Sequence, residues 1–156
     1  MPTRNESTTT AGPAPAATEH LEVCDTDSQY GLGVRTLIPR RKGEIVHRFT
    51  GVVGPELKQH SLQVPEGLHI SETTVIGFLS HSCDPNCRLD MAEFEVEALK
   101  DVRPGDLLTI DYAATEDVLY RQFACHCGAR GCRHWITGRA EGPNAEGRAY
   151  LATLTP

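Results

Sequence analysis

The chain has 156 residues, a formal net charge of −6 and a pI near 5.6, so its length predicts one domain and its charge argues against a protein that coats nucleic acid. No run of about 18 apolar residues is present to cross a membrane, and residues 1–20 contain no apolar segment of a secretory signal. We therefore expect an intracellular, cytoplasmic protein, in which clustered cysteines more often bind metal than form disulfides.

The first third of the chain predicts a tail followed by short strands. Residues 1–19 are rich in Thr, Ala and Pro and lack bulky apolar side chains, which predicts a disordered tail. A strand is expected at 21–24, and the glycines of 31–33 predict a flexible turn. Segments 34–38 and 45–53 are β-like and flank the turn PRRKG, so we expect them to form a hairpin.

The rest of the chain predicts more short strands and little helix. Residues 55–67 are polar and irregular, and candidate strands follow at 69–71 and 75–79. Residues 93–99 alternate between apolar and acidic side chains, as a half-buried strand does, and 107–112 is another candidate. Helix is expected only at 116–122 and near 146–154. About eight short strands predict a mainly β fold.

The stretch FLSHSCDPNC, residues 78–87, combines an apolar start with a polar turn. His81, Cys83 and Cys87 lie close together, and Pro85 prevents a regular element from continuing through the turn. This pattern favours a buried strand that ends in a rigid loop at a site, although a surface loop with an incidental histidine is the plainer alternative.

The stretch FACHCGARGC, residues 123–132, places Cys125, Cys127 and Cys132 at the spacing C-x-C-x4-C. Three clustered thiols are one ligand short of a tetrahedral zinc site. Cys83 is the first candidate for the fourth ligand, with Cys87, His81 and His126 as alternatives, and free buried cysteines or disulfides remain the competing interpretation.

Together these two stretches resemble motifs of the SET-domain protein-lysine methyltransferases. SHSCDPN resembles the family's NHSCxPN signature, and FACHCGARGC resembles its post-SET zinc motif. GDLLTIDY, residues 105–112, is similar to the GEEL-x-x-DY segment, and YGLGVRTLIPRRKGEIV, residues 30–46, to the cofactor-binding strand. The four motifs follow the family's order over roughly two thirds of the chain, and the short insert resembles that of small stand-alone microbial members.

The resemblance implies a SET fold, with several small curved sheets and a pseudo-knot, followed by a post-SET zinc segment. It divides the chain into a tail at 1–19, a SET domain at 20–120 and a post-SET zinc segment with a C-terminal tail at 121–156.

The resemblance also implies roles for individual residues. Tyr112 matches the catalytic tyrosine, and zinc is expected on Cys83, Cys125, Cys127 and Cys132. Contacts to the cofactor S-adenosylmethionine are expected from Gly31, Leu32, Gly33, Ser80, His81, Tyr112, Phe123 and His126, with Cys125 beside the adenine ring. Phe49 and Ile110 match positions in the substrate channel.

Three positions depart from the family pattern. Ser80 replaces an asparagine, Phe49 replaces a tyrosine, and Ile110 replaces an aromatic residue that limits how many methyl groups are added. The resemblance as a whole implies an S-adenosylmethionine-dependent N-methyltransferase that acts on a protein lysine or another amine, whereas Ser80 and Phe49 favour weaker activity. A zinc-stabilised module that binds cofactor or peptide with weak or no turnover remains the alternative. No direct contact with nucleic acid or membrane is expected, and the sequence leaves the oligomeric state open.

Overall fold

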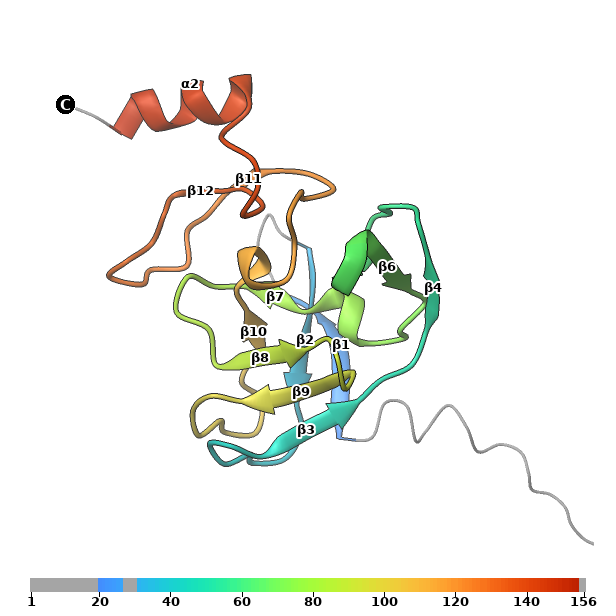
Figure 1. Ribbon diagram of the computed structural model, residues 1–156. Coiled ribbons are helices and arrows are strands. Elements are labelled where there is room, and N and C mark those ends of the chain that lie inside the picture. The colour runs from blue at the N-terminus through green and yellow to red at the C-terminus, as the bar shows by residue number, and fades with distance from the viewer. Residues whose placement is uncertain (1–19, 27–30, 155–156) are drawn as a thin grey trace, which may run out of the picture.

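The computed structural model describes residues 20–26 and 31–154 (Figure 1). The tail expected at 1–19 and Tyr30 of the first motif lie outside this range. Within it, short strands form five small sheets, accompanied by one α-helix. The mainly β prediction is therefore confirmed. No helix in the described part of the chain is long and apolar enough to cross a membrane.

The first sheet is an antiparallel pair of β1 (Leu21–Asp25) and β2 (Leu32–Thr36). Val34 at its centre is fully buried, which anchors the pair in the core. The hairpin expected between 34–38 and 45–53 is wrong. The turn between them instead bonds to a later segment. The Arg40 N–H donates to the Val102 carbonyl at 2.9 Å, and the Gly43 N–H donates to the Ala98 carbonyl at 2.7 Å.

The second sheet has the order β3-β9-β8, with β3 at Ile45–Arg48, β9 at Glu95–Ala98 and β8 at Cys87–Asp90. The alternation predicted around β9 is confirmed, because Val96 and Ala98 are buried whereas Glu95 and Glu97 are partly exposed. Arg48 pairs with Glu95 and Arg88 with Glu97 across this sheet.

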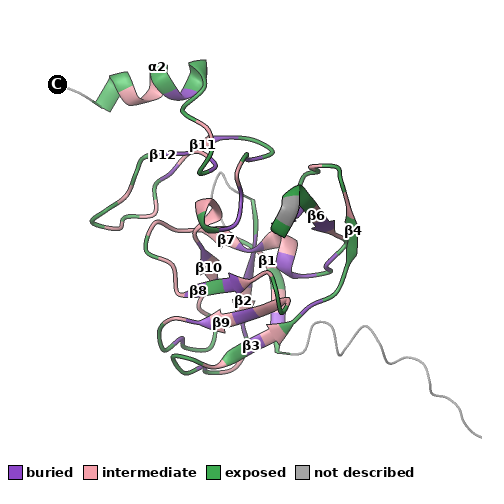
Figure 2. Cartoon of the chain, in the orientation of Figure 1, coloured by how far each residue is buried: buried purple, intermediate pink, exposed green. Residues whose placement is uncertain are grey.

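The third sheet combines strands expected near 52–53 and 69–71 with one, β5, in the segment that was expected to be irregular. Its order is β4-β6-β5, with β4 at Val52–Gly54, β6 at Leu68–Ser71 and β5 at Leu62–Val64. A 3-10 turn, η2 (Pro65–Gly67), joins β5 to β6. All three residues of β5 are buried, whereas the two valines of β4 are exposed (Figure 2).

The two central motifs meet at a fourth, parallel pair between β7 (Ser80–His81) and β10 (Thr109–Ile110). Asn86 fastens the loop after β7 to this second segment. Its Nδ2 donates to the Leu107 carbonyl at 2.9 Å, and its Oδ1 accepts from the Thr109 N–H at 2.8 Å. The Asn86 side chain therefore bonds to the backbone of 107–109 as a neighbouring strand would, and it holds the two motifs together.

Two predicted elements are wrong. Residues 75–79 contain the 3-10 helix η3 (Ile76–Phe78) in place of a strand, because the Phe78 N–H donates to the Val75 carbonyl at 3.0 Å and the Gly77 N–H donates to Thr73 Oγ1 at 3.1 Å. Residues 116–122 are irregular, because their backbone groups bond to the C-terminal segment: the carbonyl of Glu116 accepts from the Arg139 N–H at 3.0 Å. A short 3-10 helix, η4 (Tyr112–Ala114), precedes them.

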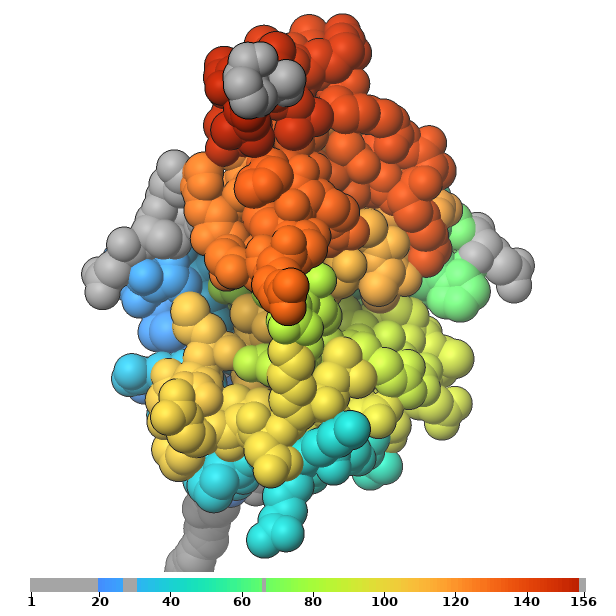
Figure 3. Space-filling model, turned by 90° about the vertical axis from the view of Figure 1, so that its left-hand side faces the viewer, coloured from blue at the N-terminus to red at the C-terminus, as the bar shows by residue number. Residues whose placement is uncertain are grey.

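The C-terminal segment forms a cap over one end of the molecule (Figure 3, orange to red). It contains a fifth pair, β11 (Phe123–Ala124) with β12 (Trp135–Ile136), and ends in α2 (Ala145–Leu154), as predicted near 146–154. A small core of Leu119, Cys125 and Ile136 holds the cap together, separate from the main core. Tyr112 packs against both cores, so it lies where cap and body meet.

Candidate active site and metal centre

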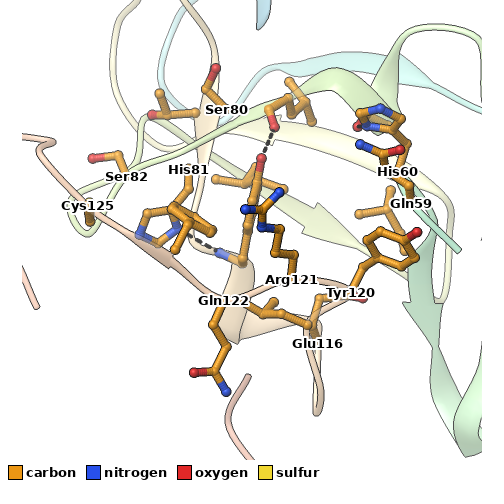
Figure 4. A pocket seen from close by; sticks show the side chains of 18 of the residues that line it. Gln59, His60, Ser80, His81, Ser82, Glu116, Tyr120, Arg121, Gln122 and Cys125 are labelled. Atoms are coloured by element: carbon orange, nitrogen blue, oxygen red, sulfur yellow. Dashed lines mark hydrogen bonds between the residues drawn. The ribbon is translucent and has the colours of Figure 1, made fainter. Parts of the chain in front are cut away.

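A cavity of about 930 Å³ lies where the cap meets the body. Its walls come from segments far apart in the sequence: the start of β2, β7 with its loop, β10, η4, β11 and α2. Figure 4 shows side chains around it, among them Ser80, His81 and Ser82 of β7 and its loop, and Glu116, Tyr120 and Gln122 of the segment before β11. Of the residues expected to contact the cofactor, the cavity wall includes Leu32, Ser80, His81, Tyr112, Phe123 and His126.

Tyr112 lies at the centre of this arrangement, at the first residue of η4. Its hydroxyl donates to the carbonyl oxygen of Leu79 at 2.5 Å, so the proton is engaged and the oxygen lone pairs remain available. Burial, with a smaller contribution from the nearby Glu116 carboxylate, raises the pKa of Tyr112 to about 12. The hydroxyl is therefore neutral at physiological pH.

His81 is locked between Tyr112 and the cysteine cluster. Its Nδ1 accepts the backbone N–H of Tyr112 at 3.1 Å, and its Nε2 lies 3.5 Å from Cys83 Sγ. Burial lowers the pKa of His81 to about 4, against the attraction of Asp111, so the ring is neutral. The rings of His81, Tyr112 and Phe123 pack edge-to-face, with centroids 5.2–5.8 Å apart.

The glycines of the first motif allow the chain to pass close to this wall. Gly31 has φ +78°, and its carbonyl accepts from the Thr26 hydroxyl at 2.6 Å. A Cβ at Gly33 would lie 2.8 Å from Ser80 Oγ, so only glycine permits this approach of β2 to Ser80. Leu32 between them is half exposed and lines the cavity.

Only one of the two residues expected in the substrate channel lines the cavity. Ile110 lines the cavity and is buried. Phe49 is buried in the main core, where its ring packs edge-to-face on Phe94 with centroids 5.7 Å apart, and it is not among the residues of the cavity wall.

The four cysteines predicted to bind metal lie together. The Sγ atoms of Cys83, Cys125, Cys127 and Cys132 are all within 4.8 Å of one another. Zinc–sulfur bonds of about 2.3 Å in a tetrahedron need sulfur atoms about 3.8 Å apart, so this set fits zinc with little movement. The remaining cysteines, Cys24 and Cys87, lie outside the cluster, in β1 and in the main core.

The surroundings of the cluster act on its thiols in opposite directions, because burial raises the pKa of Cys125 whereas that of Cys127 is lowered. Burial opposes ionisation of Cys127, but backbone N–H groups at Ala129 and Cys83 and the neighbouring thiols bring the pKa of Cys127 down to about 6. The N–H of Arg133 donates to Cys83 Sγ at 3.4 Å. Thiolate ligands and donors around them are what a structural zinc site requires.

Two residues of the site had no motif to identify them. Arg133 pairs with Asp111 at 2.7 Å and so ties the cysteine loop to the residue before Tyr112. Glu116, only 5% exposed, lines the cavity and accepts from the Gln63 N–H and the Thr115 hydroxyl at 2.8 Å. Burial raises the pKa of Glu116. The only sign of Glu116 in the sequence was that a charged residue follows Asp111 and Tyr112 within a few positions.

Comparisons with known proteins agree with this geometry. The family model described as SET domain matches residues 31–113. Methyltransferase flvH from Aspergillus flavus is 32% identical over 128 residues, which cover 80% of this chain and 71% of flvH. The probable histone-lysine N-methyltransferase lin-59 from Caenorhabditis elegans is 30% identical over 133 residues, but the chain spans only 10% of that protein.

A solved structure is also similar. The structure of KRYPTONITE in complex with mCHH DNA, an H3(1-15) peptide and SAH matches 74% of this chain and 29% of that chain, at 27% identity and a TM-score of 0.57. The chain therefore belongs to the SET domain family, and it is a methyltransferase of that family. The fold class expected from the four motifs is confirmed.

Proposed function

We propose that the chain transfers a methyl group from S-adenosylmethionine to an amine nitrogen, on a lysine of a protein or peptide or on another amine. The observation that carries the proposal is the position of the Tyr112 hydroxyl, which lines the cavity and is held by the Leu79 carbonyl between the Ser80–His81 and Phe123–His126 walls. The support for the cofactor is that the similar KRYPTONITE structure contains SAH, the demethylated form of S-adenosylmethionine.

The residues of the cavity suit the parts of such a cofactor. When bound, S-adenosylmethionine supplies an electrophilic methyl group on a sulfonium. The Ser80 hydroxyl lines the cavity and can bond to the amino-acid end. The rings of Phe123 and His126 offer apolar faces for an adenine.

Tyr112 then acts at the place where amine and methyl group meet. Because its proton is donated to Leu79, its oxygen can accept a hydrogen bond from the attacking amine and orient the nitrogen lone pair. With a pKa near 12 it stays neutral and is not a base at pH 7. The amine must therefore lose its ammonium proton to solvent, and the site contributes positioning and fixed dipoles.

The proposed zinc on Cys83, Cys125, Cys127 and Cys132 has a structural role. Its ligands come from both central and C-terminal motifs, so the metal would fasten the cap to the loop that carries His81. The same cap carries Phe123 and His126 to the cavity. Metal binding would in this way complete the cavity without taking part in the reaction.

A lysine-containing peptide is the substrate class that the comparisons favour. The KRYPTONITE complex contains an H3 peptide, and lin-59 is named as a probable histone-lysine enzyme. The net charge of −6 suits a basic peptide. The name of flvH states no substrate, so another amine stays within the proposal.

A binding module without turnover is the second candidate. Ser80 offers one hydroxyl where the family has an amide, and Phe49, which lacks the hydroxyl of the tyrosine it replaces, lies in the core and outside the cavity wall. Incubation with labelled S-adenosylmethionine and whole-cell lysate, basic peptides and small amines distinguishes the two. Label on an amine product supports the enzyme, whereas bound cofactor with no labelled product on any amine supports the module.

A further inference from the structure

The C-terminal helix α2 contributes to the wall of the cavity, although no motif assigned a role to it. Glu146 and Tyr150 of this helix line the cavity together with Trp135 and His126. Figure 1 shows α2 as the outermost element of the cap, beyond β11 and β12. The proposed site therefore extends past the post-SET cysteines into the last helix.

The helix is fixed at one position on its inner side. Gly147 is its single buried residue among those described, and it lies so close to the Trp135 indole that an added Cβ would be 2.2 Å from Nε1. The same indole nitrogen donates to Gln122 Oε1 at 2.8 Å, and Asn144 Oδ1 accepts the Gly147 N–H at 2.8 Å at the start of the helix. The orientation of Glu146 and Tyr150 is thus set by packing.

Tyr150 is only partly covered by this packing. Its ring lies 5.8 Å from that of Trp135 and 6.3 Å from that of His126, and the residue is partly exposed beside the cavity. Three aromatic rings from β12, the cysteine segment and α2 therefore surround one end of the cavity. A planar ligand inserted there would complete the burial of Tyr150.

We infer that α2 binds the adenosine part of the cofactor: the Tyr150 ring packs on the adenine beside His126, and the Glu146 carboxylate accepts hydrogen bonds from the ribose hydroxyls. A purine presents a π face that stacks on aromatic side chains, and a carboxylate is a common partner of a ribose diol. This inference rests on the proposed use of S-adenosylmethionine.

The test is calorimetric binding of S-adenosylhomocysteine to the full chain and to variants of α2. Tyr150→Ala should weaken binding by about tenfold or more, since loss of one base–aromatic stack has that effect. Tyr150→Phe keeps the ring and should bind within about twofold of wild type, whereas Glu146→Gln should bind several-fold more weakly. Leu154→Ala, on an exposed side chain of the same helix outside the cavity wall, is the control and should bind normally.

A second readout does not depend on the variants. Trp135 is the only tryptophan of the chain and lines the proposed adenosine end, so binding of S-adenosylhomocysteine should change its fluorescence. Melting curves and zinc content of each variant show whether it is folded.

The outcomes separate this inference from the proposed function. Wild-type binding with a fluorescence change, weakened by Tyr150→Ala and Glu146→Gln, supports it. If the wild type binds and both variants have affinities within about twofold of it, the inference is overturned while the cofactor proposal stands. The same holds if binding leaves the fluorescence of Trp135 unchanged. No binding by the wild type overturns the cofactor proposal and this inference together.

Discussion

At the scale of single residues, the site depends on hydrogen bonds that fix two aromatic side chains. Leu79 holds the Tyr112 hydroxyl, and the Tyr112 N–H holds the His81 ring. Each bond joins one central motif to the other. The residues that the sequence singled out are therefore coupled, and a change at one of them acts on the geometry of the others.

Ser80→Asn should tighten binding of S-adenosylhomocysteine by about twofold to a hundredfold, because the added amide supplies one or two hydrogen bonds of roughly 0.5–1.5 kcal/mol each. Gly33 lies against Ser80, so the larger side chain must point into the cavity. Calorimetry on both proteins measures the change. Equal or weaker binding by the variant would show that the site is adapted to serine.

Glu116→Gln should stabilise the fold at neutral pH. Burial raises the pKa of Glu116, so the wild type is stabilised by the protonated form below about pH 4.5 and loses that contribution as pH rises through the raised folded pKa. The melting temperature of the variant minus that of the wild type should therefore be larger at pH 8 than at pH 5.

Exposed Glu93 provides the control for this experiment, since Glu93→Gln makes the same substitution without burial. A Glu116→Gln difference that stays constant with pH, or that falls as pH rises, would be inconsistent with a buried carboxylate of raised pKa.

At the scale of elements, alternating patterns and ordered motifs could be read from the sequence, but strand partners could not. The alternation around β9 and the C-terminal helix were predicted. Strand partners were not: β2 pairs with β1, which precedes it, and β3 pairs with β9 far along the chain, where Ile45 lies opposite Glu97. Residues 75–79 form a 3-10 turn held by the bond from the Gly77 N–H to the Thr73 hydroxyl oxygen, which an apolar run does not reveal.

The candidate site was predictable where motifs carry it and not elsewhere. The four cysteines come together as expected, and Tyr112 lines the cavity. Glu146 and Tyr150 line it too, but they lie in a helix whose position depends on the fit of Gly147 against Trp135. No local spacing encodes that contact.

The zinc content of the protein tests whether the four clustered cysteines bind a metal. The purified chain should contain one zinc, and Cys83→Ser should lose most of it, because the remaining three thiolates leave the tetrahedron incomplete. Cys24→Ser, in β1 and outside the cluster, should keep it. Elemental analysis of the three proteins, with melting curves, checks this, and unchanged zinc in Cys83→Ser would exclude Cys83 as a ligand.

Removal of zinc by a chelator should loosen the cap before the body. The small core of the cap includes Cys125 and packs against three further cysteines of the cluster, whereas the main core has its own apolar cluster. Hydrogen exchange should therefore rise first over residues 119–136, and S-adenosylhomocysteine binding should fall with it. Uniform exchange over cap and body would contradict a separate cap.

At the scale of the whole molecule, body and cap enclose one cavity between them. The proposed division into a tail at 1–19, a SET domain at 20–120 and a zinc segment from 121 stays a prediction. The structure adds that the third part lines the cavity along with the second. Cofactor binding and the integrity of the cap should therefore vary together.

The central claim is that Tyr112 takes part in methyl transfer in this cavity. Tyr112→Phe removes one oxygen and keeps the ring, so S-adenosylhomocysteine affinity should change little. The melting temperature should fall by a few degrees at most, because one bond to Leu79, worth on the order of 1 kcal/mol, is lost. Turnover should fall about a hundredfold or more, since a preorganised polar group at the reacting centre contributes about 3 kcal/mol.

The most direct measurement is therefore methyl transfer from labelled S-adenosylmethionine to an amine acceptor by wild type, Tyr112→Phe and Tyr120→Phe. Tyr120 is an exposed tyrosine of the same cavity wall and serves as the matched control. We predict transfer by the wild type and Tyr120→Phe, and a loss of about a hundredfold in Tyr112→Phe with cofactor binding intact. Equal transfer by all three proteins, or bound cofactor without transfer by the wild type on any amine, would contradict it.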